Sequence, residues 1–274
     1  MEVPLDLPGL SGYIVSRPYQ GESEGGDVHF VSSCGTGRIT RILLADVSGH
    51  GEAAGQLGRR LRDLMFRYLN HVRPNALAKR LNREVIGLVG QSGRFATGLI
   101  VTFFSPHGHM SICNAGHPPP LLYRAATNQW EAVRNTSLRG VSNLPLGIVE
   151  NSGYVGHRLT LEPGDLLLGY SDCLIEATDV DGEMLQVEGL LKMAGLLTPE
   201  QMAEPQLAVT GLMQTLEDAG CQLDDDMTVF ALRCTERSRG RGLRAFARGT
   251  LRAIRRVGQP RLLPLPDLPT RWRV

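Results

Sequence analysis

Four aspartates that stand where predicted strands begin or end are the residues of this chain best suited to chemistry. They are Asp27, Asp46, Asp172 and Asp225, the last within a run of three aspartates whose other members are alternatives. Sets of oxygen ligands suit Mg²⁺ or Mn²⁺ better than Zn²⁺. Two such ions that share one aspartate would activate a water for attack on phosphorus. The chain shows no convincing Ser-His-Asp or Cys-His order and no GxxxxGK[ST] motif.

The stretch RILLADVSGHG, residues 41–51, indicates how the first pair of aspartates is positioned. Its branched apolar run predicts a buried strand that ends at Asp46 in a glycine-rich turn. Asp27 begins the preceding alternating strand, and the turn CGTGR predicts a hairpin that would bring the two carboxylates side by side. Carboxylates so placed repel each other unless a cation lies between them. An ordinary turn residue at Asp27 and a helix-capping role for Asp46 remain the alternatives.

The second pair has the same design. GDLLLGYSD predicts a turn, a buried strand over 166–170 and a carboxylate, Asp172, just past the strand end. LDDDMTVFAL places three aspartates directly before a strand over 227–232. Adjacent carboxylates at a strand start are costly unless water or a metal surrounds them. An exposed acidic turn is the alternative for that run.

The remaining elements must position these strand ends. Apolar spacing predicts amphipathic helices over 52–70 and 75–90, with further helical segments at 187–196 and 199–219. Alternating and apolar runs predict strands at 11–17, 96–105, 110–113, 121–124, 130–133 and 153–159. Three consecutive prolines in NAGHPPP make residues 114–120 a rigid loop. His107 and His109 lie in a tight turn without neighbouring acids, and we interpret them as surface residues rather than metal ligands.

Composition and charge limit the class of protein. The 274 residues, 42% of them hydrophobic, are enough for a substantial core, and no apolar run approaches the roughly 18 residues of a membrane span. Residues 1–10 lack the basic start of a signal peptide. Five cysteines without CxxC spacing favour neither a disulfide framework nor a zinc site, and predict a cytoplasmic location.

Six motifs in order carry a family resemblance. The chain resembles the metal-dependent protein phosphatases (PPM), and most of all their bacterial SpoIIE/RsbU-type branch, over roughly residues 8–234. The motifs are GGD at 25–27, ADVSGHG at 45–51, FATGLIVTF at 95–103, NAGHPPPLL at 114–122, GDLLLGYSDCLIEATD at 164–179 and DDDMTVFAL at 224–232.

The resemblance implies a fold, a metal centre and a reaction. The fold would be α+β, a four-layer α-β-β-α sandwich of two antiparallel sheets flanked by helices. Two Mn²⁺ or Mg²⁺ ions would lie at one end. Asp46 would bridge both, Asp27 and the backbone carbonyl of Val47 would bind one, and Asp172 and Asp225 would bind the other. The reaction would be hydrolysis of phosphoserine or phosphothreonine by metal-activated water, without a phosphoenzyme.

The resemblance also implies partners. The expected substrate is a phosphorylated STAS-domain antagonist of an anti-sigma factor in a partner-switching pathway. Because only about ten residues precede the expected catalytic region, we expect regulation by a separate activator protein or by the tail. The helix over 52–70 belongs to the element that positions the metal loop in the family, so an activator docking there would shift an inactive–active equilibrium.

Several residues depart from the family pattern or have no assigned role. Val28-His29-Phe30 replaces the usual aromatic–Asp pair, and Cys173 replaces the glycine of the usual TDG. If that position needs a positive φ, Cys173 costs about 1 kcal/mol and displaces Asp172. This favours the alternative function, a catalytically inactive phosphatase fold that acts as a binding module. We interpret His50, Asn114, His117 and Glu176 as local structure, and choose no phosphate-binding residue among Arg17, Arg38 and Arg41.

The chain divides into two segments of opposite charge. Residues 1–235 form the expected phosphatase domain, with a net charge of −8, whereas residues 236–274 hold 11 Arg, one Glu and one Asp. This Arg-rich and Pro-rich tail contains a predicted amphipathic helix at 243–257. It would contact an anionic membrane surface or an acidic protein surface, or remain a solubilising tail. The acidic body and the lack of interleaved aromatic residues argue against nucleic acid as the main partner.

Overall fold

The computed structural model describes most of the domain and none of the tail. The described residues are 1–19, 26–34, 36–49, 52–68, 71, 73–90, 92–134 and 142–235. The predicted tail helix at 243–257, Gly25 and His50 lie outside these ranges. No helix within them combines the length and apolar character needed to cross a bilayer.

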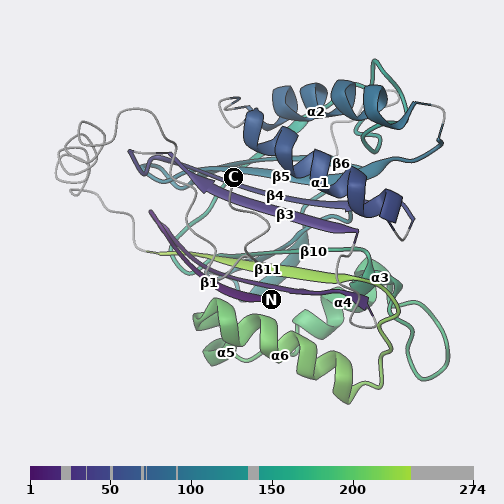
Figure 1. Cartoon of the computed structure of the whole chain (residues 1–274). Helices are drawn as coiled ribbons and strands as arrows, with labels where there is room; N and C mark the ends of the chain where they lie inside the picture. Colours follow the sequence, from purple (N-terminus) through teal and green to yellow (C-terminus); the bar gives the residue numbers. More distant parts are fainter. Residues whose placement is uncertain are drawn as a thin grey trace.

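Two antiparallel sheets pack face to face, and helices cover both outer faces (Figure 1). The six-stranded sheet has the order β1-β2-β11-β10-β7-β8, and the five-stranded sheet has the order β3-β4-β5-β6-β9. The strands are β1 Glu2–Leu7, β2 Leu10–Arg17, β3 Asp27–Ser33, β4 Ile39–Val47, β5 Ala96–Phe104, β6 His109–Ala115, β7 Leu121–Arg124, β8 Gln129–Ala132, β9 Gly156–Thr160, β10 Leu166–Tyr170 and β11 Met227–Cys234. The expected α-β-β-α sandwich is confirmed.

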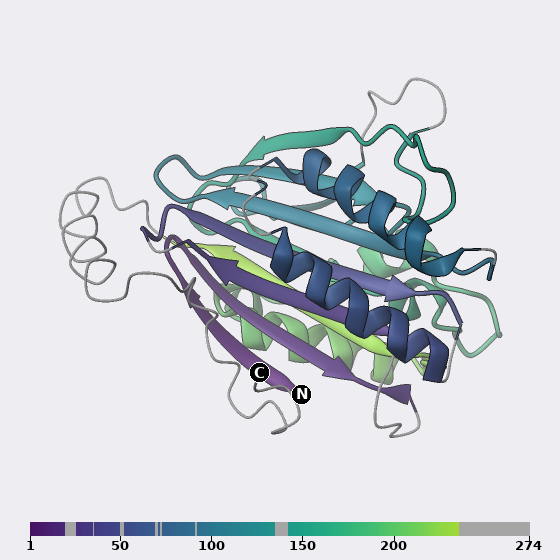
Figure 2. The same cartoon turned by 45° about the horizontal axis from the view of Figure 1, so that its top comes forward.

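Apart from the short α3, which we did not predict, the helices lie close to their predicted positions. They are α1 Glu52–Arg67, α2 Pro74–Val89, α3 Cys173–Glu176, α4 Gln186–Ala194, α5 Pro199–Ala203 and α6 Pro205–Asp218. Helices α1 and α2 cover the five-stranded sheet, as Figure 2 shows from above, while α4, α5 and α6 cover the six-stranded sheet. The single helix expected at 199–219 is divided at Glu204, whose extended backbone separates α5 from α6.

Strand β4 shows how the apolar pattern produces the layers. Its side chains alternate, so that Leu43 and Ala45 pack beneath α1 and α2, whereas Ile42 and Leu44 face the other sheet. All four are buried, which explains why the sequence shows a continuous apolar run there instead of alternation. The apolar layer between the two sheets is therefore formed by the side chains on one face of each central strand.

The first ten residues behave differently from our expectation. We assigned no strand to them, but residues 2–7 form the edge strand β1, paired with β2 over its whole length. Val3, Leu5 and Leu7 point inward and their neighbours outward, an alternation that could have identified the strand. Pro4 is tolerated because the strand lies at the edge of its sheet.

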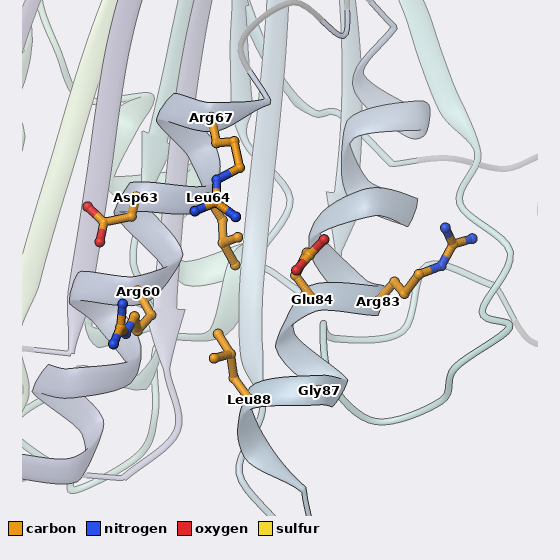
Figure 3. A pocket seen from close by; sticks show the side chains of 8 residues that line it. All are labelled: Arg60, Asp63, Leu64, Arg67, Arg83, Glu84, Gly87 and Leu88. Carbon is orange, nitrogen blue, oxygen red and sulfur yellow. The ribbon is translucent and has the colours of Figure 1, made fainter.

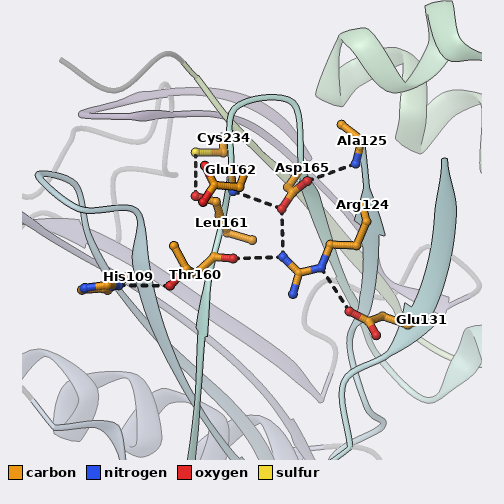
Figure 4. Close-up of polar contacts among 9 residues, drawn as sticks. All are labelled: His109, Arg124, Ala125, Glu131, Thr160, Leu161, Glu162, Asp165 and Cys234. Atoms are coloured by element: carbon orange, nitrogen blue, oxygen red, sulfur yellow. Dashed lines mark hydrogen bonds and ion pairs between the residues drawn. The ribbon is translucent and has the colours of Figure 1, made fainter. Parts of the chain in front are cut away.

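A buried ion pair fastens the end of β7 to the turn before β10 (Figure 4). Asp165 is 2% exposed and accepts hydrogen bonds from Arg124 Nη1 at 2.9 Å and from the backbone N–H groups of Ala125 and Glu162 at 3.0 Å each. Arg124 also contacts Glu131 at 3.2 Å, on the exposed side of the pair. Both oxygens of the buried carboxylate are therefore engaged.

We expect Asp165→Ala to lower the free energy of unfolding by about 3 kcal/mol, because it leaves two backbone donors and part of a guanidinium without an acceptor. Urea unfolding followed by circular dichroism measures the change. Glu131→Gln is the matched control and should cost less than about 1 kcal/mol, because its ion pair is solvated. Equal effects of the two substitutions would contradict a structural role for the buried pair.

Candidate metal centre

The four predicted aspartates gather at one end of the sandwich. Asp27 is paired directly with Asp46 across the β3–β4 hairpin, as its turn predicted. Strands β10 and β11 are also antiparallel neighbours, so the end of β10, followed by Asp172, lies beside the start of β11, preceded by Asp225. Each sheet therefore contributes two carboxylates to the end of the molecule at which α3 lies (Figure 1).

The electrostatics of Asp46 indicate how close these groups are. Burial raises the pKa of Asp46 to about 7, and the negative charges of Asp172, Asp225, Asp226 and Glu176 add to the effect. The pKa of Asp172 is also raised, by burial and then by Glu176 and Asp225. Such mutual repulsion marks a site where a cation would be favoured.

Asp27 is the most enclosed member of the group. Neither of its carboxylate oxygens is reached by solvent or has a hydrogen-bond partner among the described residues. Burial, followed by the charge of Asp46, raises its pKa well above the ordinary value. The hydroxyls of Ser171 and Thr228 lie near enough to oppose this, but they donate to the Asp226 carbonyl at 3.2 Å and to Ser16 Oγ at 3.0 Å. A buried carboxylate without a donor is costly unless something positive neutralises it.

The fifth predicted donor, the Val47 carbonyl, faces the same region. A Cβ added at Gly26 would lie 3.0 Å from the Val47 carbonyl oxygen and 3.2 Å from Asp46 Oδ1. A glycine at position 26 therefore leaves open the space beside these two oxygens. Among the described residues, no group of three or more His, Cys, Asp or Glu side chains is positioned to hold a single metal ion. The chemistry of the donors nonetheless fits Mg²⁺ or Mn²⁺, since all five offer oxygen.

The structure distinguishes the three consecutive aspartates. Asp226 accepts the backbone N–H of Tyr19 at 2.7 Å and that of Gly26, so it connects the chain between β2 and β3 to the start of β11. Among the described residues, the Asp225 carboxylate accepts only the N–H of Asp226, at 2.7 Å. Asp224 and Asp225 are both exposed, but the charge of Asp225, unlike that of Asp224, is among those that raise the pKa of Asp46. Asp225 thus remains available as a ligand. Sequence reasoning missed the positioning role of Asp226, because three adjacent aspartates look alike without their partners.

Cys173 is accommodated without the strain that its replacement of glycine suggested. It is the first residue of α3 and is not among the described non-glycine residues with positive φ. Its buried thiol donates to the backbone carbonyl of Asp225 at 3.3 Å. The thiol therefore connects the two loops that carry Asp172 and Asp225, and the argument that favoured an inactive binding module does not hold at this residue.

Two residues of the NAGHPPP loop are engaged as local structure, as we interpreted them. His117 Nδ1 lies 2.8 Å from the Thr97 hydroxyl and Nε2 lies 2.9 Å from the Tyr170 carbonyl. Burial lowers the pKa of His117 to about 4, so the ring is neutral at pH 7. Asn114 accepts the N–H of His117 and donates to its carbonyl, which holds the turn.

The structure also shows at which end of the sandwich the residues with open or discounted roles lie. Glu176 is exposed, yet its charge raises the pKa of Asp46 and Asp172, so it lies nearer the carboxylate group than we expected. Arg17 ends β2 opposite Met227 and is therefore at the carboxylate end, where it pairs with Glu2 at 3.3 Å. Arg38 and Arg41 lie at the opposite end, in and beside the β3–β4 turn.

A cavity of about 390 Å³ lies between α1 and α2 (Figure 3). None of the four aspartates lines it. Its lining residues are Arg60, Asp63, Leu64, Arg67, Arg83, Glu84, Gly87 and Leu88. Helix α1 starts shortly after the turn that follows Asp46. The same helix therefore begins near the carboxylate end and lines this charged cavity.

The raised pKa values predict that the metal-free protein loses stability as pH rises. The folded state keeps protons on Asp27 and Asp46 that the unfolded chain releases. The stabilisation is therefore complete below about pH 4 and is lost as the pH rises through the folded pKa values, which is about 7 for Asp46. In EDTA, we expect a lower melting temperature at pH 8 than at pH 6, and Asp46→Asn should reduce that difference. Mn²⁺ should stabilise more at pH 8, because protons compete with the metal.

The exposed Asp224 provides the control for this measurement. Asp224→Asn should retain the pH dependence of the unmodified protein in EDTA. Melting temperatures that are the same at pH 6 and pH 8 for the metal-free protein would contradict the electrostatic description of the carboxylate group.

Comparison with known proteins identifies the family. The sequence model of the family described as Stage II sporulation protein E (SpoIIE) matches residues 36–235. No curated protein matches the chain by sequence.

Solved structures of related proteins share the fold. The RsbU and RsbW domains of a Mycobacterium tuberculosis protein are 23% identical, with a TM-score of 0.71 over 87% of this chain and 64% of that chain. The PP2C phosphatase domain of Bacillus subtilis SpoIIE with a fragment of its regulatory domain is 20% identical, with a TM-score of 0.67 over 82% and 63%. RsbX in complex with magnesium is 17% identical, with a TM-score of 0.62 over 86% and 100%. The chain thus spans slightly less than two thirds of two of these three.

The match to the family covers most of the domain, and the two antiparallel sheets flanked by helices agree with the fold that the six motifs implied. The chain therefore belongs to the family described as Stage II sporulation protein E (SpoIIE), and it shares the fold of the PP2C phosphatase domain of Bacillus subtilis SpoIIE.

Proposed function

We propose that this protein is an active phosphatase that hydrolyses phosphoserine or phosphothreonine with water activated at a binuclear Mn²⁺ or Mg²⁺ centre. One observation carries the proposal: four carboxylates and a backbone carbonyl from both sheets lie at one end, where burial, followed by the charges of the neighbouring carboxylates, raises the pKa of Asp46 to about 7. Asp46 would bridge the two ions. Asp27 and the Val47 carbonyl would hold one of them, and Asp172 and Asp225 the other.

The chain's own residues supply the positioning. Bound divalent cations would provide a water of lowered pKa and balance the charge of the phosphoryl group. Asp226 holds the segment before Asp27 through two backbone N–H groups, and the Cys173 thiol holds the backbone of Asp225. His117 is neutral and its ring nitrogens are both engaged, so it does not serve as a proton donor. We therefore assign proton transfer in the reaction to the clustered carboxylates and to water.

Catalysis should depend on the individual metal ligands and not on the total negative charge of the site. With Mn²⁺ and an aryl phosphate substrate, Asp46→Asn and Asp225→Asn should each lower kcat/KM by roughly 100-fold or more, because a charged ligand is lost while its shape remains. EDTA should abolish the activity of the unmodified protein. Steady-state release of the phenol measures the effect.

Asp224→Asn is the matched control, since it removes the same charge one residue away from the proposed ligand. It should retain activity within about threefold, because the charge of Asp224, unlike that of Asp225, is not among those that raise the pKa of Asp46 and Asp172. An Asp46→Asn variant as active as the unmodified protein would eliminate the bridging role. Equal loss in Asp224→Asn and Asp225→Asn would eliminate the assignment within the acidic run.

We further propose that the substrate is a phosphorylated STAS-domain antagonist in a partner-switching pathway, within the cytoplasm. The proposal is supported by membership of the family and by similarity to a chain that carries RsbU and RsbW domains. A separate activator protein would dock on α1, whose cavity with α2 presents Arg60, Arg67 and Arg83. Contact of the 236–274 tail with a membrane or an acidic protein surface stays a prediction.

The substrate prediction can be measured with phosphorylated STAS domains of the same host. Phosphate release from serine-phosphorylated STAS domains should exceed release from a phosphotyrosine peptide of equal concentration, by at least roughly tenfold in kcat/KM. The Asp46→Asn variant is the blank for contaminating phosphatases. Turnover confined to phosphotyrosine or small phosphate esters would contradict this substrate class while leaving the metal-dependent activity intact.

A further inference from the structure

The turn between β3 and β4 holds a free cysteine, Cys34, at the end of the sandwich opposite α3 (Figure 1). Its backbone closes the hairpin, with the Cys34 N–H donating to the Ile39 carbonyl at 2.9 Å and the Gly37 N–H donating to the Cys34 carbonyl at 2.8 Å. The residue is half-buried, so its sulfur remains within reach of a small reagent. None of the proposed metal ligands lies in this turn.

The turn directs hydrogen-bond donors at the sulfur. The Ile39 N–H donates to Sγ at 3.2 Å, and the Thr36 hydroxyl lies 3.0 Å from it. Burial raises the pKa of Cys34, but the Thr36 hydroxyl and the backbone N–H groups of Ile39, Arg38 and Thr36 outweigh it, so that the pKa is lower than usual. Successive N–H groups that point at one atom form a concavity suited to an anion.

A buried guanidinium lies near enough to the Cys34 sulfur for their charges to interact. Arg41 is 7% exposed, its Nε has no hydrogen-bond partner among the described residues, and no described carboxylate forms an ion pair with it. Alternation along β3 and β4 places Cys34 and Arg41 on the same face of the sheet, two residues out of register, within reach of a long side chain. Burial lowers the pKa of Arg41, and the charge of Cys34 is the effect that opposes this.

No anion on the adjacent strand competes with Cys34 for Arg41, because β5 has no charged residue. The charged side chains of the turn and of this end of β4 are Arg38 and Arg41, both cationic. A buried guanidinium without a carboxylate is costly, and a thiolate at Cys34 would compensate it.

Other cysteines of the domain differ from Cys34. Burial raises the pKa of Cys113 and Cys173 to about 12. Cys221 is also half-buried, but burial and the charge of Asp179 raise its pKa. Cys221 is therefore a natural control, with similar access and the opposite electrostatic surroundings.

We propose that Cys34 reacts as a thiolate stabilised by the hydrogen-bond donors of the β3–β4 turn and by the charge of Arg41, and that it is a modification site for hydrogen peroxide. The sulfur attacks one peroxide oxygen, an S–O bond forms, and the O–O bond breaks with its electron pair leaving on hydroxide. Hydroxide takes a proton from solvent and becomes water. Cysteine is thereby oxidised by two electrons to sulfenic acid and peroxide is reduced to water.

The test uses the full chain with all five cysteines and follows each by mass spectrometry. With limiting iodoacetamide at pH 7, Cys34 should be alkylated at least roughly tenfold faster than Cys221, because the thiolate is the reacting form. With hydrogen peroxide and dimedone, the sulfenic acid adduct should form at Cys34 before Cys221. Equal rates at the two cysteines, or adducts that form first at Cys221, would overturn the proposal.

Two variants test the stated cause. Arg41→Met should move the midpoint of the alkylation rate of Cys34 to higher pH and slow its reaction at pH 7 by roughly tenfold, which corresponds to about one pKa unit. Thr36→Val removes the exposed hydroxyl without disturbing a buried side chain, and should act in the same direction. If Arg41→Met does not fold, Thr36→Val decides the question. A midpoint unchanged in the folded variants would refute the role of the turn and the guanidinium.

The proposal is independent of the phosphatase reaction. Cys34→Ser should leave turnover of an aryl phosphate unchanged and abolish the fast-alkylating site. Persistence of a fast-reacting thiol in Cys34→Ser would assign the reactivity to another cysteine and overturn the proposal.

Discussion

Repulsion among buried carboxylates is the constraint on which the rest of this structure depends. Asp27 and Asp46 are paired across one hairpin, and Asp172 and Asp225 approach from the other sheet. Without a cation, the folded protein accommodates the group by keeping protons on the two most enclosed carboxylates. Each additional carboxylate in the group makes folding less favourable near neutral pH and binding of a divalent cation more favourable, so stability and metal affinity are opposed.

The scaffold must resist this repulsion, and it does so mainly with backbone contacts. Asp226 accepts two N–H groups from the chain before β3, and the Ser171 hydroxyl accepts the N–H of Thr228 at 2.9 Å while donating to the carbonyl of Asp226. The Cys173 thiol adds a contact to the carbonyl of Asp225. These bonds connect the ends of β2, β3, β10 and β11, so the position of each carboxylate is set by neighbours that do not themselves bind a cation. The apolar layer between the sheets then holds the two halves together.

The two ends of the β3–β4 hairpin have opposite chemistry. At the open end, two aspartates face each other, whereas the closed end contains a cysteine near a buried arginine and several N–H donors. The same pair of strands therefore carries a site that attracts cations at one end and a concavity that stabilises an anion at the other. The seven paired positions of the hairpin separate them, so a change at the turn need not alter the carboxylates.

Local pattern alone determined much of this protein. The apolar runs located β4 and β10 closely, the turn CGTGR predicted the Asp27–Asp46 pairing, and six motifs in order identified the family before any fold was known. These features are local because strand period, turn chemistry and apolar spacing act over a few residues. The alternation in β1 was also visible in the sequence, although we assigned no strand there.

Only the tertiary structure decided the roles that depend on partners distant in sequence. Asp226 differs from Asp225 because its carboxylate accepts hydrogen bonds from the N–H groups of Tyr19 and Gly26, about 200 residues away in the sequence. Arg17 and Arg41 look alike in sequence, yet the sheets bring one to the carboxylate end and bury the other beside Cys34. The helical φ of Cys173 likewise depends on how α3 begins after β10. Sequence spacing cannot distinguish such residues, because the contacts that give them their roles are made only when the two sheets pack together.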